Sequence, residues 1–249
     1  MSYVIKDIKF LKDCFLLMIS NQNYRIDEYL YKVIFPYKNK ELDEETFQLV
    51  QSFSNAFLVL KPLYKKIYSN EISQYELAKI CFHKDVSKKD VAIILKQLKK
   101  DQYLDEKKFI DFHQPIFEKN KGIKVFENFL NDNRISQNII QEALNEYQEN
   151  EAYVLQYMQS HIRSNSSSNK MLKYKLKNTL YQKGFSTSII ENCLYQCELN
   201  DDNENLKKDY HKFLLKYGEN PHKIISKLIN KGYNIEEVKK IVKGGEEYE

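Results

Sequence analysis

Hydrophobic and polar positions along most of this chain follow a pattern of two helices joined by a tight turn. In the clearest copy, at 172–194, Leu176 and Leu180 lie one helical turn apart, Gly184 ends the first helix and Ser186 opens the second. Glycine takes the left-handed conformation that closes a helix at little cost. Serine is a favoured N-cap, since its hydroxyl accepts a hydrogen bond from a free backbone N–H. The segment therefore predicts a helix–turn–helix unit.

The same pattern is present four times at a nearly constant spacing. The residues that correspond to Ser186 are Ser87, Ser136 and Asn234, and successive caps are 49, 50 and 48 residues apart. Each cap is preceded by a large apolar residue: Val86, Ile135, Phe185 and Tyr233. Each is followed four residues later by another: Val91, Ile140, Ile190 and Val238. These pairs predict hydrophobic staples, and a fixed period of this size is the signature of a repeat protein.

We therefore expect a mainly α protein, built from tandem three-helix repeats with a period of about 49 residues. Repeats that touch mainly their sequence neighbours form an elongated, curved body. The predicted divisions are 61–121 for repeat 1, 122–169 for repeat 2 with a flexible Ser/Asn-rich joint at 164–169, 170–219 for repeat 3, and 220–249 for a two-helix repeat 4 and a tail. In repeat 1, Asp105 is expected to cap the third helix and Pro115 to kink or end it.

Residues 1–60 do not follow this pattern. The apolar run Cys14–Ile19, the polar residues 20–23 and the segment 24–26 predict a β-hairpin. A short helix is expected at 27–35, before Pro36, and another that starts at Asp43. These elements predict a small α/β N-terminal module that consists of a β-hairpin and helices.

Composition and charge narrow the class of protein. With 42% hydrophobic residues but only 6 Gly and 4 Pro, the chain has enough apolar residues for a core and suits a helical fold. A net charge of +4 permits contact with nucleic acid or with an acidic protein surface. The four cysteines show no CxxC spacing, and the apolar run Cys14–Ile19 is too short for a membrane span. We expect a reduced, cytoplasmic protein that makes no membrane contact.

With these elements in this order, the sequence resembles the RecX family, regulators of the bacterial recombinase RecA. The segment 72–106 resembles the first RecX repeat, and 173–194 resembles the third, including its Lys-Gly-Phe-Ser turn at 183–186. The hairpin and the Glu-Leu-Asp-Glu-Glu stretch at 41–45 are similar to the N-terminal extension of many Gram-positive members. The chain departs from the family at Ile72, where Arg is common, and at Asp85 and Arg134, where the later repeats have Gly.

The resemblance implies a regulator without enzymatic activity or cofactor, which binds RecA in the groove of its DNA-bound filament. Such a protein inhibits filament extension, ATP hydrolysis, strand exchange and the co-protease activity that triggers the SOS response. We expect a monomer with at most weak contact to single-stranded or double-stranded DNA. Two alternatives stay open: a helical-repeat module that binds single-stranded nucleic acid by itself, and a protein–protein adaptor unrelated to recombination.

Partner-binding residues are predicted from charge. The stretch 170–183 contains no acid and, beside Tyr174 and Tyr181, the five lysines Lys170, Lys173, Lys175, Lys177 and Lys183. These charges suit an acidic RecA surface or filament DNA, and equally a solvated helix face. Lys88 and Lys89, in the first turn of a predicted helix, are disfavoured there by the helix dipole, which points to a role in binding. Arg134 completes the predicted set.

Catalytic and metal sites are not predicted. The five histidines include no HExxH motif, and neither a GxxxxGK[ST] nor a GxGxxG loop is present. Cys193 and Cys197 lie one helical turn apart, but no second ligand pair follows at zinc spacing. We therefore expect no catalytic residue, no metal and no enzymatic activity.

Overall fold

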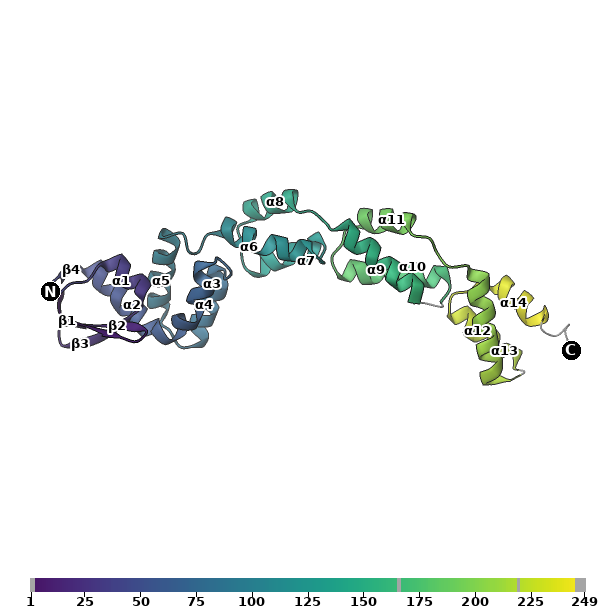
Figure 1. Ribbon diagram of the computed structural model, residues 1–249, viewed down its shortest axis with the longest axis horizontal. Coiled ribbons are helices and arrows are strands. Elements are labelled where there is room, and N and C mark those ends of the chain that lie inside the picture. Colours follow the sequence, from purple (N-terminus) through teal and green to yellow (C-terminus); the bar gives the residue numbers. More distant parts are fainter. Residues whose placement is uncertain (1–2, 165–166, 219, 245–249) are drawn as a thin grey trace. The chain divides into compact units, whose positions relative to one another are not determined.

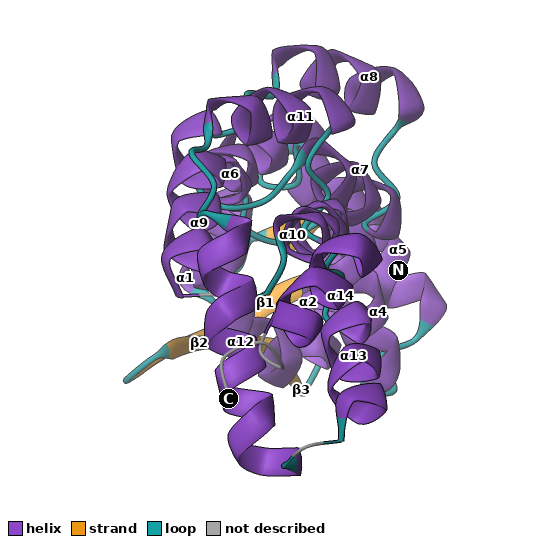
Figure 2. Ribbon diagram, turned by 90° about the vertical axis from the view of Figure 1, so that its right-hand side faces the viewer, coloured by secondary structure: helices purple, strands orange, loops and turns teal. Residues whose placement is uncertain are grey.

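The computed structural model describes residues 3–164, 167–218 and 220–244 of the chain. These residues form one four-stranded sheet near the N-terminus and 14 α-helices (Figure 1). Within the described part, strands occur in this N-terminal module alone (Figure 2). The mainly α class and the small strand module that the sequence predicts are therefore confirmed. No described helix combines the length and the apolar character needed to span a membrane.

The chain divides into two compact units. Unit 1 comprises 1–115 and 129–143, and unit 2 comprises 116–128 and 144–249. The predicted elongated, curved body stays a prediction. Residues 165–166 of the predicted joint and 245–249 of the predicted tail lie outside the described residues.

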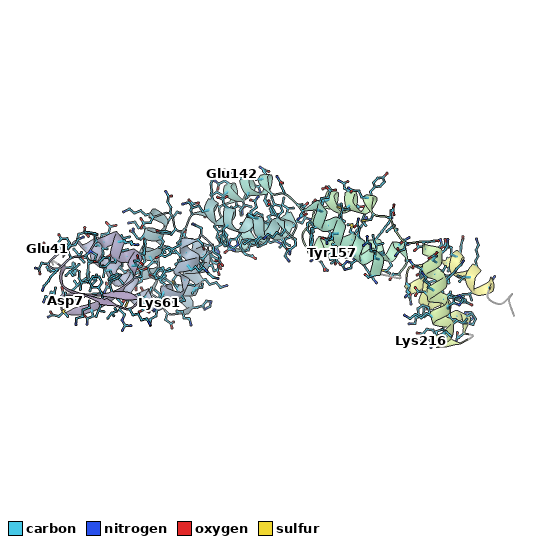
Figure 3. The ribbon with its side chains drawn as sticks, viewed as in Figure 1. Asp7, Glu41, Lys61, Glu142, Tyr157 and Lys216 are labelled. Carbon is cyan, nitrogen blue, oxygen red and sulfur yellow. The ribbon has the colours of Figure 1, made fainter. Side chains whose placement is uncertain are left out.

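Unit 1 begins with an antiparallel sheet of order β3-β2-β1-β4. Its strands are β1 (Tyr3–Leu11), β2 (Cys14–Ile19), β3 (Gln22–Ile26) and β4 (Glu41–Leu42). The predicted hairpin is β2 and β3, whereas β1 and β4 were not predicted. Helices α1 (Glu28–Ile34) and α2 (Glu44–Leu60) cover one face of the sheet (Figure 1). Asp27 and Asp43 cap these helices, and Lys61, labelled in Figure 3, pairs with Asp13 in the β1–β2 turn.

Helices follow one another through the rest of the chain. A 3₁₀ helix (Lys61–Leu63) and α3 (Tyr64–Tyr68) lead into α4 (Gln74–His83), α5 (Lys88–Lys100) and α6 (Glu106–Glu118). The next three are α7 (Ile123–Asp132), α8 (Gln137–Glu146) and α9 (Glu151–Ser164). The last five are α10 (Asn169–Gln182), α11 (Thr187–Gln196), α12 (Asp202–Tyr217), α13 (Pro221–Asn230) and α14 (Ile235–Gly244).

Pro115 does not end α6, so that part of the prediction is wrong. The helix continues from Pro115 to Glu118. Proline removes the N–H that would bond to the carbonyl of Asp111 one turn earlier. Both residues are exposed, so water can satisfy that carbonyl. Asp105, by contrast, caps α6 as predicted, because its Oδ1 accepts from the N–H of Lys108 at 3.0 Å.

The four predicted turns share one backbone conformation. Asp85, Arg134, Gly184 and Gly232 have φ values of 58°, 56°, 84° and 88°. In each turn the following residue donates its backbone N–H to a carbonyl five residues earlier, as Phe185 does to Leu180 at 3.1 Å. This arrangement is the Schellman motif that closes a helix. The turn is therefore regular even where Asp or Arg replaces Gly.

The start of a first helix also contacts the turn of the following repeat. Ser73 Oγ donates to Asn133 Oδ1 at 2.7 Å, Gly122 donates its N–H to the carbonyl of Lys183 at 2.9 Å, and Ser168 Oγ donates to the carbonyl of Lys231 at 3.0 Å. The three contacts repeat one geometry along the chain, each within its own unit. The period in the sequence thus corresponds to a repeated packing contact.

One predicted cap works differently from the expectation. Ser186 is the N-cap of α11 by its backbone, but its hydroxyl donates to Glu149 Oε2, lies 3.1 Å from the hydroxyl of Ser188, and accepts no backbone N–H of its own helix. Glu149 Oε1 also accepts from the N–H of Ser186 at 2.8 Å and from the N–H of Ile123 at 3.2 Å. Glu106 binds the N–H and hydroxyl of Ser136 in the same way, at 3.2 and 2.7 Å. A carboxylate thus joins one repeat to the next cap.

Candidate partner-binding surface

The candidate surface lies on α10, and burial of one side of this helix determines which residues it exposes. Ser168 caps this helix by accepting from the N–H of Met171 at 3.3 Å. Leu172, Leu176 and Leu180 are spaced four residues apart and are all buried in the core that α9, α10 and α11 share. Because a helix has 3.6 residues per turn, burial of this stripe directs the residues between them to the solvent.

The opposite side of α10 is basic and aromatic. It consists of Lys170, Lys173, Tyr174, Lys177 and Tyr181, at spacings of three and four residues, and we call it the α10 basic face. Tyr174 is 62% exposed, and the hydroxyl of Tyr181 lies 2.8 Å from Thr187 Oγ1. The face thus holds an exposed ring among positive charges.

Ion pairs divide the lysines of this helix into two groups. Lys177 Nζ lies 2.5 Å from Glu191 Oε1 on α11, so its charge is partly neutralised. Lys170 and Lys173, and Lys175 on the flank of the face, are exposed and form no ion pair with any described residue. These three ammonium groups are therefore available to a partner.

Lys183 has a structural role in the turn that follows α10. Its Nζ lies 5.5 Å from the ring centre of Tyr157 and 5.9 Å from that of Tyr153, both on α9 (Tyr157 is labelled in Figure 3). Its carbonyl accepts from Gly122. A half-buried lysine held by two rings stabilises the turn through cation–π contacts and offers less charge to a partner.

The other three predicted residues belong to unit 1. Lys88 and Lys89 are exposed in the first turn of α5. In that turn Ser87 Oγ donates to Asp90 Oδ2 at 2.8 Å and accepts from the N–H of Asp90 at 3.1 Å. The negative charge of Asp90 offsets the unfavourable interaction of the helix dipole with Lys88 and Lys89. That unfavourable interaction is the feature from which their role in binding is predicted. The role of both lysines in binding stays a prediction.

Arg134 lies in the turn between α7 and α8, also in unit 1. It is exposed, and its guanidinium carbon lies 4.8 Å from the ring centre of Tyr75. Arg134 and the two α5 lysines belong to unit 1, whereas Lys170, Lys173, Lys175, Lys177 and Lys183 belong to unit 2. The structure thus brings four of the predicted lysines together on α10, and the part that all eight residues play in binding stays a prediction.

A second basic face was missed from the sequence. Lys207, His211 and Lys212 are exposed on α12 beside Leu215, which is 90% exposed. Lys208, also on this side, pairs with Glu204 at 3.6 Å. The sequence signal that could have predicted this face is the spacing of its basic residues by three and four positions. The acidic residues Glu204 and Asp209, which occur in the same segment, obscure that signal. Asp209 is buried, where it accepts from Lys231 Nζ at 2.6 Å and from the Tyr233 hydroxyl at 2.8 Å, and it therefore leaves the surface basic.

The cysteines offer no reactive site among the described residues. All four are buried and unpaired, and no cluster of metal-ligand residues occurs in the described part of the chain. Burial raises the pKa of the Cys193 thiol to about 11, and Cys197 Sγ lies 4.0 Å from Met158 Sδ. Both thiols therefore belong to the core that holds α9 to α11.

We expect all four thiols of the native protein to resist a water-soluble disulfide reagent. Burial limits access, and the raised pKa of Cys193 leaves almost no thiolate, the reactive form, at pH 8. The thiols are counted by the absorbance of the released thiolate before and after the protein is unfolded in guanidinium chloride. Rapid reaction of the folded protein would contradict this placement.

The relatives and the solved structure to which this chain is similar carry the same name, regulatory protein RecX. No family model matches the chain. Regulatory protein RecX of Streptococcus mutans serotype c is 24% identical over 216 residues, which cover 81% of this chain and 83% of the relative. Regulatory protein RecX of Streptococcus agalactiae serotype Ia is 28% identical over 181 residues, 67% of this chain and 70% of the relative. A crystal structure of regulatory protein RecX has the same fold, with a TM-score of 0.55 and 17% identity over 76% of this chain and 98% of that chain.

Proposed function

We propose that this chain is a regulatory protein of the RecX family, like the relatives that it resembles over most of its length, and that it binds the recombinase RecA and its DNA-bound filament. The expected effect is inhibition of filament extension, ATP hydrolysis, strand exchange and the co-protease activity that triggers the SOS response. The protein acts in the cytoplasm as a monomer, and the role needs no chemistry of its own.

The observation that carries the proposal is the repeated helix–turn–helix packing in a chain that matches RecX relatives over most of its length. Helical repeats offer successive surfaces with similar geometry, which suits a partner that is itself a helical polymer. A protein that bridges neighbouring subunits favours one filament state and shifts the equilibrium by its difference in affinity for the two states.

The test is RecA-dependent ATP hydrolysis on single-stranded DNA, with this protein titrated from substoichiometric to equimolar amounts. We expect hydrolysis to fall at substoichiometric amounts, because one molecule that blocks a filament end stops the addition of many subunits. Hydrolysis that is unchanged at an equimolar amount would refute the proposal. The same titration onto DNA without RecA is the control.

A second function, direct binding of single-stranded nucleic acid, is favoured by the α10 basic face. Exposed Tyr174 among lysines resembles the combination of a stacking ring and a positive groove in proteins that bind single strands. That binding would occur without RecA and would weaken steeply as salt is raised, because phosphate contacts release counterions. Tight, salt-sensitive binding to DNA alone would favour this second function.

A further inference from the structure

A cleft of about 750 Å³ in unit 1 is lined by tyrosines and carboxylates. The aromatic part comes from Tyr29 on α1, Tyr64 and Tyr68 on α3, and Tyr103 after α5. The acidic part comes chiefly from Asp27, which precedes α1, and Asp101, which follows α5. None of these residues belongs to the α10 basic face. The cleft draws on both the N-terminal module and the first repeat, and it is a feature of unit 1 that the proposed function does not use.

Asp27 is the unusual member of this set. It is only 7% exposed, and its Oδ1 caps α1 by accepting from the N–H of Leu30 at 2.9 Å. Its Oδ2 is buried and accepts no hydrogen bond of good geometry among the described residues, although the hydroxyls of Tyr64 and Tyr68 lie close enough to interact with the carboxylate. Burial raises the pKa of Asp27, while the N–H of Leu30 and the nearby hydroxyl of Tyr64 act in the opposite direction. A buried carboxylate oxygen without a well-aligned partner is costly, and a cationic ligand would satisfy it.

The other charges of the cleft leave it acidic. Glu28 pairs with Lys32 at 2.6 Å and Asp13 pairs with Lys61, so these four charges offset one another. Asp101 Oδ2 accepts from the Tyr29 hydroxyl at 2.5 Å and from Gln97 Nε2 at 2.8 Å, and these neutral donors leave its charge in place. Asp27 and Asp101 thus set a negative potential, which disfavours phosphate and nucleic acid at this site.

The tyrosines form an aromatic wall beside these two carboxylates. The ring centre of Tyr68 lies 5.0 Å from that of Tyr103, and the ring centre of Tyr29 lies 5.5 Å from that of Tyr103. Tyr68 is 41% exposed, so part of the wall faces the solvent. An aromatic face next to a carboxylate is a favourable environment for an organic cation, because the ring quadrupole and the charge both attract it.

We propose that this cleft binds the guanidinium group of an arginine side chain that a partner protein presents. A guanidinium is planar, so it stacks on Tyr103, and its forked donors match a carboxylate better than an ammonium does. Because Oδ2 of Asp27 is buried, binding includes an outward turn of the half-exposed Tyr68 side chain, which opens the way to that oxygen. Unit 1 then carries a second protein-binding site, which shares no residue with the α10 basic face of unit 2.

The test uses N-acetyl-arginine methylamide as the probe, titrated into the full-length protein. Binding is followed by the NMR signals of the Leu30 amide, which Asp27 caps, and of the Tyr68 ring. The matched neutral probe is N-acetyl-citrulline methylamide, which has nearly the same shape without the charge. We expect the arginine probe to shift both signals and the citrulline probe to leave them unchanged.

Two variants separate binding from folding. Asp27→Asn removes the charge but keeps a good N-cap, and we expect it to weaken arginine binding by about tenfold or more. Asp43→Asn makes the same change at the N-cap of α2, outside the cleft, and should bind like the unchanged protein. Unchanged binding by Asp27→Asn, or equal shifts from the citrulline probe, would overturn the proposal.

Two further probes identify the source of the cation. N-acetyl-lysine methylamide should bind more weakly than the arginine probe, and equal binding would overturn the assignment to guanidinium. Free arginine adds an α-ammonium and an α-carboxylate whose charges cancel, so a site that recognises the side chain alone should bind it no more tightly than the blocked probe, which resembles a residue within a protein. Tighter binding of free arginine would overturn the assignment to a partner protein.

Discussion

Changing Lys170, Lys173 and Lys175 together to glutamine is expected to raise the concentration of this protein that half-inhibits RecA-dependent ATP hydrolysis by about tenfold or more. The three ammonium groups are exposed and form no ion pair with any described residue. Each contributes roughly 0.5–1 kcal/mol to contact with an anionic surface, and tenfold in affinity is about 1.4 kcal/mol. Glutamine has a helix propensity close to that of lysine, so α10 should stay folded.

The matched control changes Lys239, Lys240 and Lys243 on α14 to glutamine. These lysines are also exposed on one helix, so the net charge falls by the same amount while the α10 basic face is intact. Inhibition by this control should be close to that of the unchanged protein. Equal inhibition by all three proteins would show that the α10 lysines do not contact the filament or its DNA.

A third variant tests whether the ion pair on α10 matters. Lys177 already pairs with Glu191, so Lys177→Gln should change half-inhibition by less than about threefold. A larger change than that caused by the triple substitution would mean that Lys177 leaves Glu191 to bind the partner. The half-inhibiting concentrations of the variants, measured at one salt concentration, decide between these outcomes.

Local chemistry explains why most helices were predictable. Helix starts depend on short-range bonds, as at Asp43, whose Oδ1 accepts from the N–H of Thr46 at 2.7 Å, and at Ser87, which accepts from Asp90. The apolar residues on either side of a cap are buried together, as Phe185 and Ile190 are. Such signals lie within a few residues of one another, so the sequence displays them directly.

Strand β1 could not be predicted because a bulge hides its period. Its register shifts between Ile5 and Asp7, so Ile5 pairs with Ile19 while Ile8 pairs with Leu17. Ile5 and Ile8 therefore point to the same face although they are three residues apart, a spacing typical of a helix. The face of the sheet on which Ile8 lies is therefore set by pairing with β2, and the alternation of apolar residues along β1 does not reveal it.

The contacts between repeats were not predicted, because they join residues that are far apart in the sequence. Glu149 contacts Ser186, which is 37 residues away in the sequence, and takes its hydroxyl from the expected capping role. The α10 basic face was predictable in part, since its lysines are adjacent in the sequence. The pairing of Lys177 with Glu191 and the contacts of Lys183 with Tyr153 and Tyr157 require the fold. Burial of Asp27 also follows from packing, so the acidic cleft was not foreseen.

Replacing Gly122 with alanine is expected to lower the free energy of unfolding by about 3 kcal/mol, among the largest effects of a single methyl group. A Cβ at this position would lie 2.0 Å from the carbonyl carbon of Gly184 and 2.0 Å from the backbone nitrogen of Phe185. Backbone atoms cannot turn aside as a flexible side chain can. The two repeats would therefore have to separate, which breaks the bond from the Gly122 N–H to the carbonyl of Lys183.

The comparison that isolates this effect is Ser73→Ala, at the corresponding N-cap of α4. Ser73 already has a Cβ, so alanine adds no clash and removes only the hydroxyl contacts with Glu76 and Asn133, at a cost of about 1–2 kcal/mol. Urea unfolding followed by circular dichroism gives both values. If Gly122→Ala unfolds at the same urea concentration as Ser73→Ala, the two repeats do not approach as closely as the 2.0 Å distances require. A much lower midpoint for Gly122→Ala would show that repeats 2 and 3 depend on a backbone-to-backbone contact that only glycine permits.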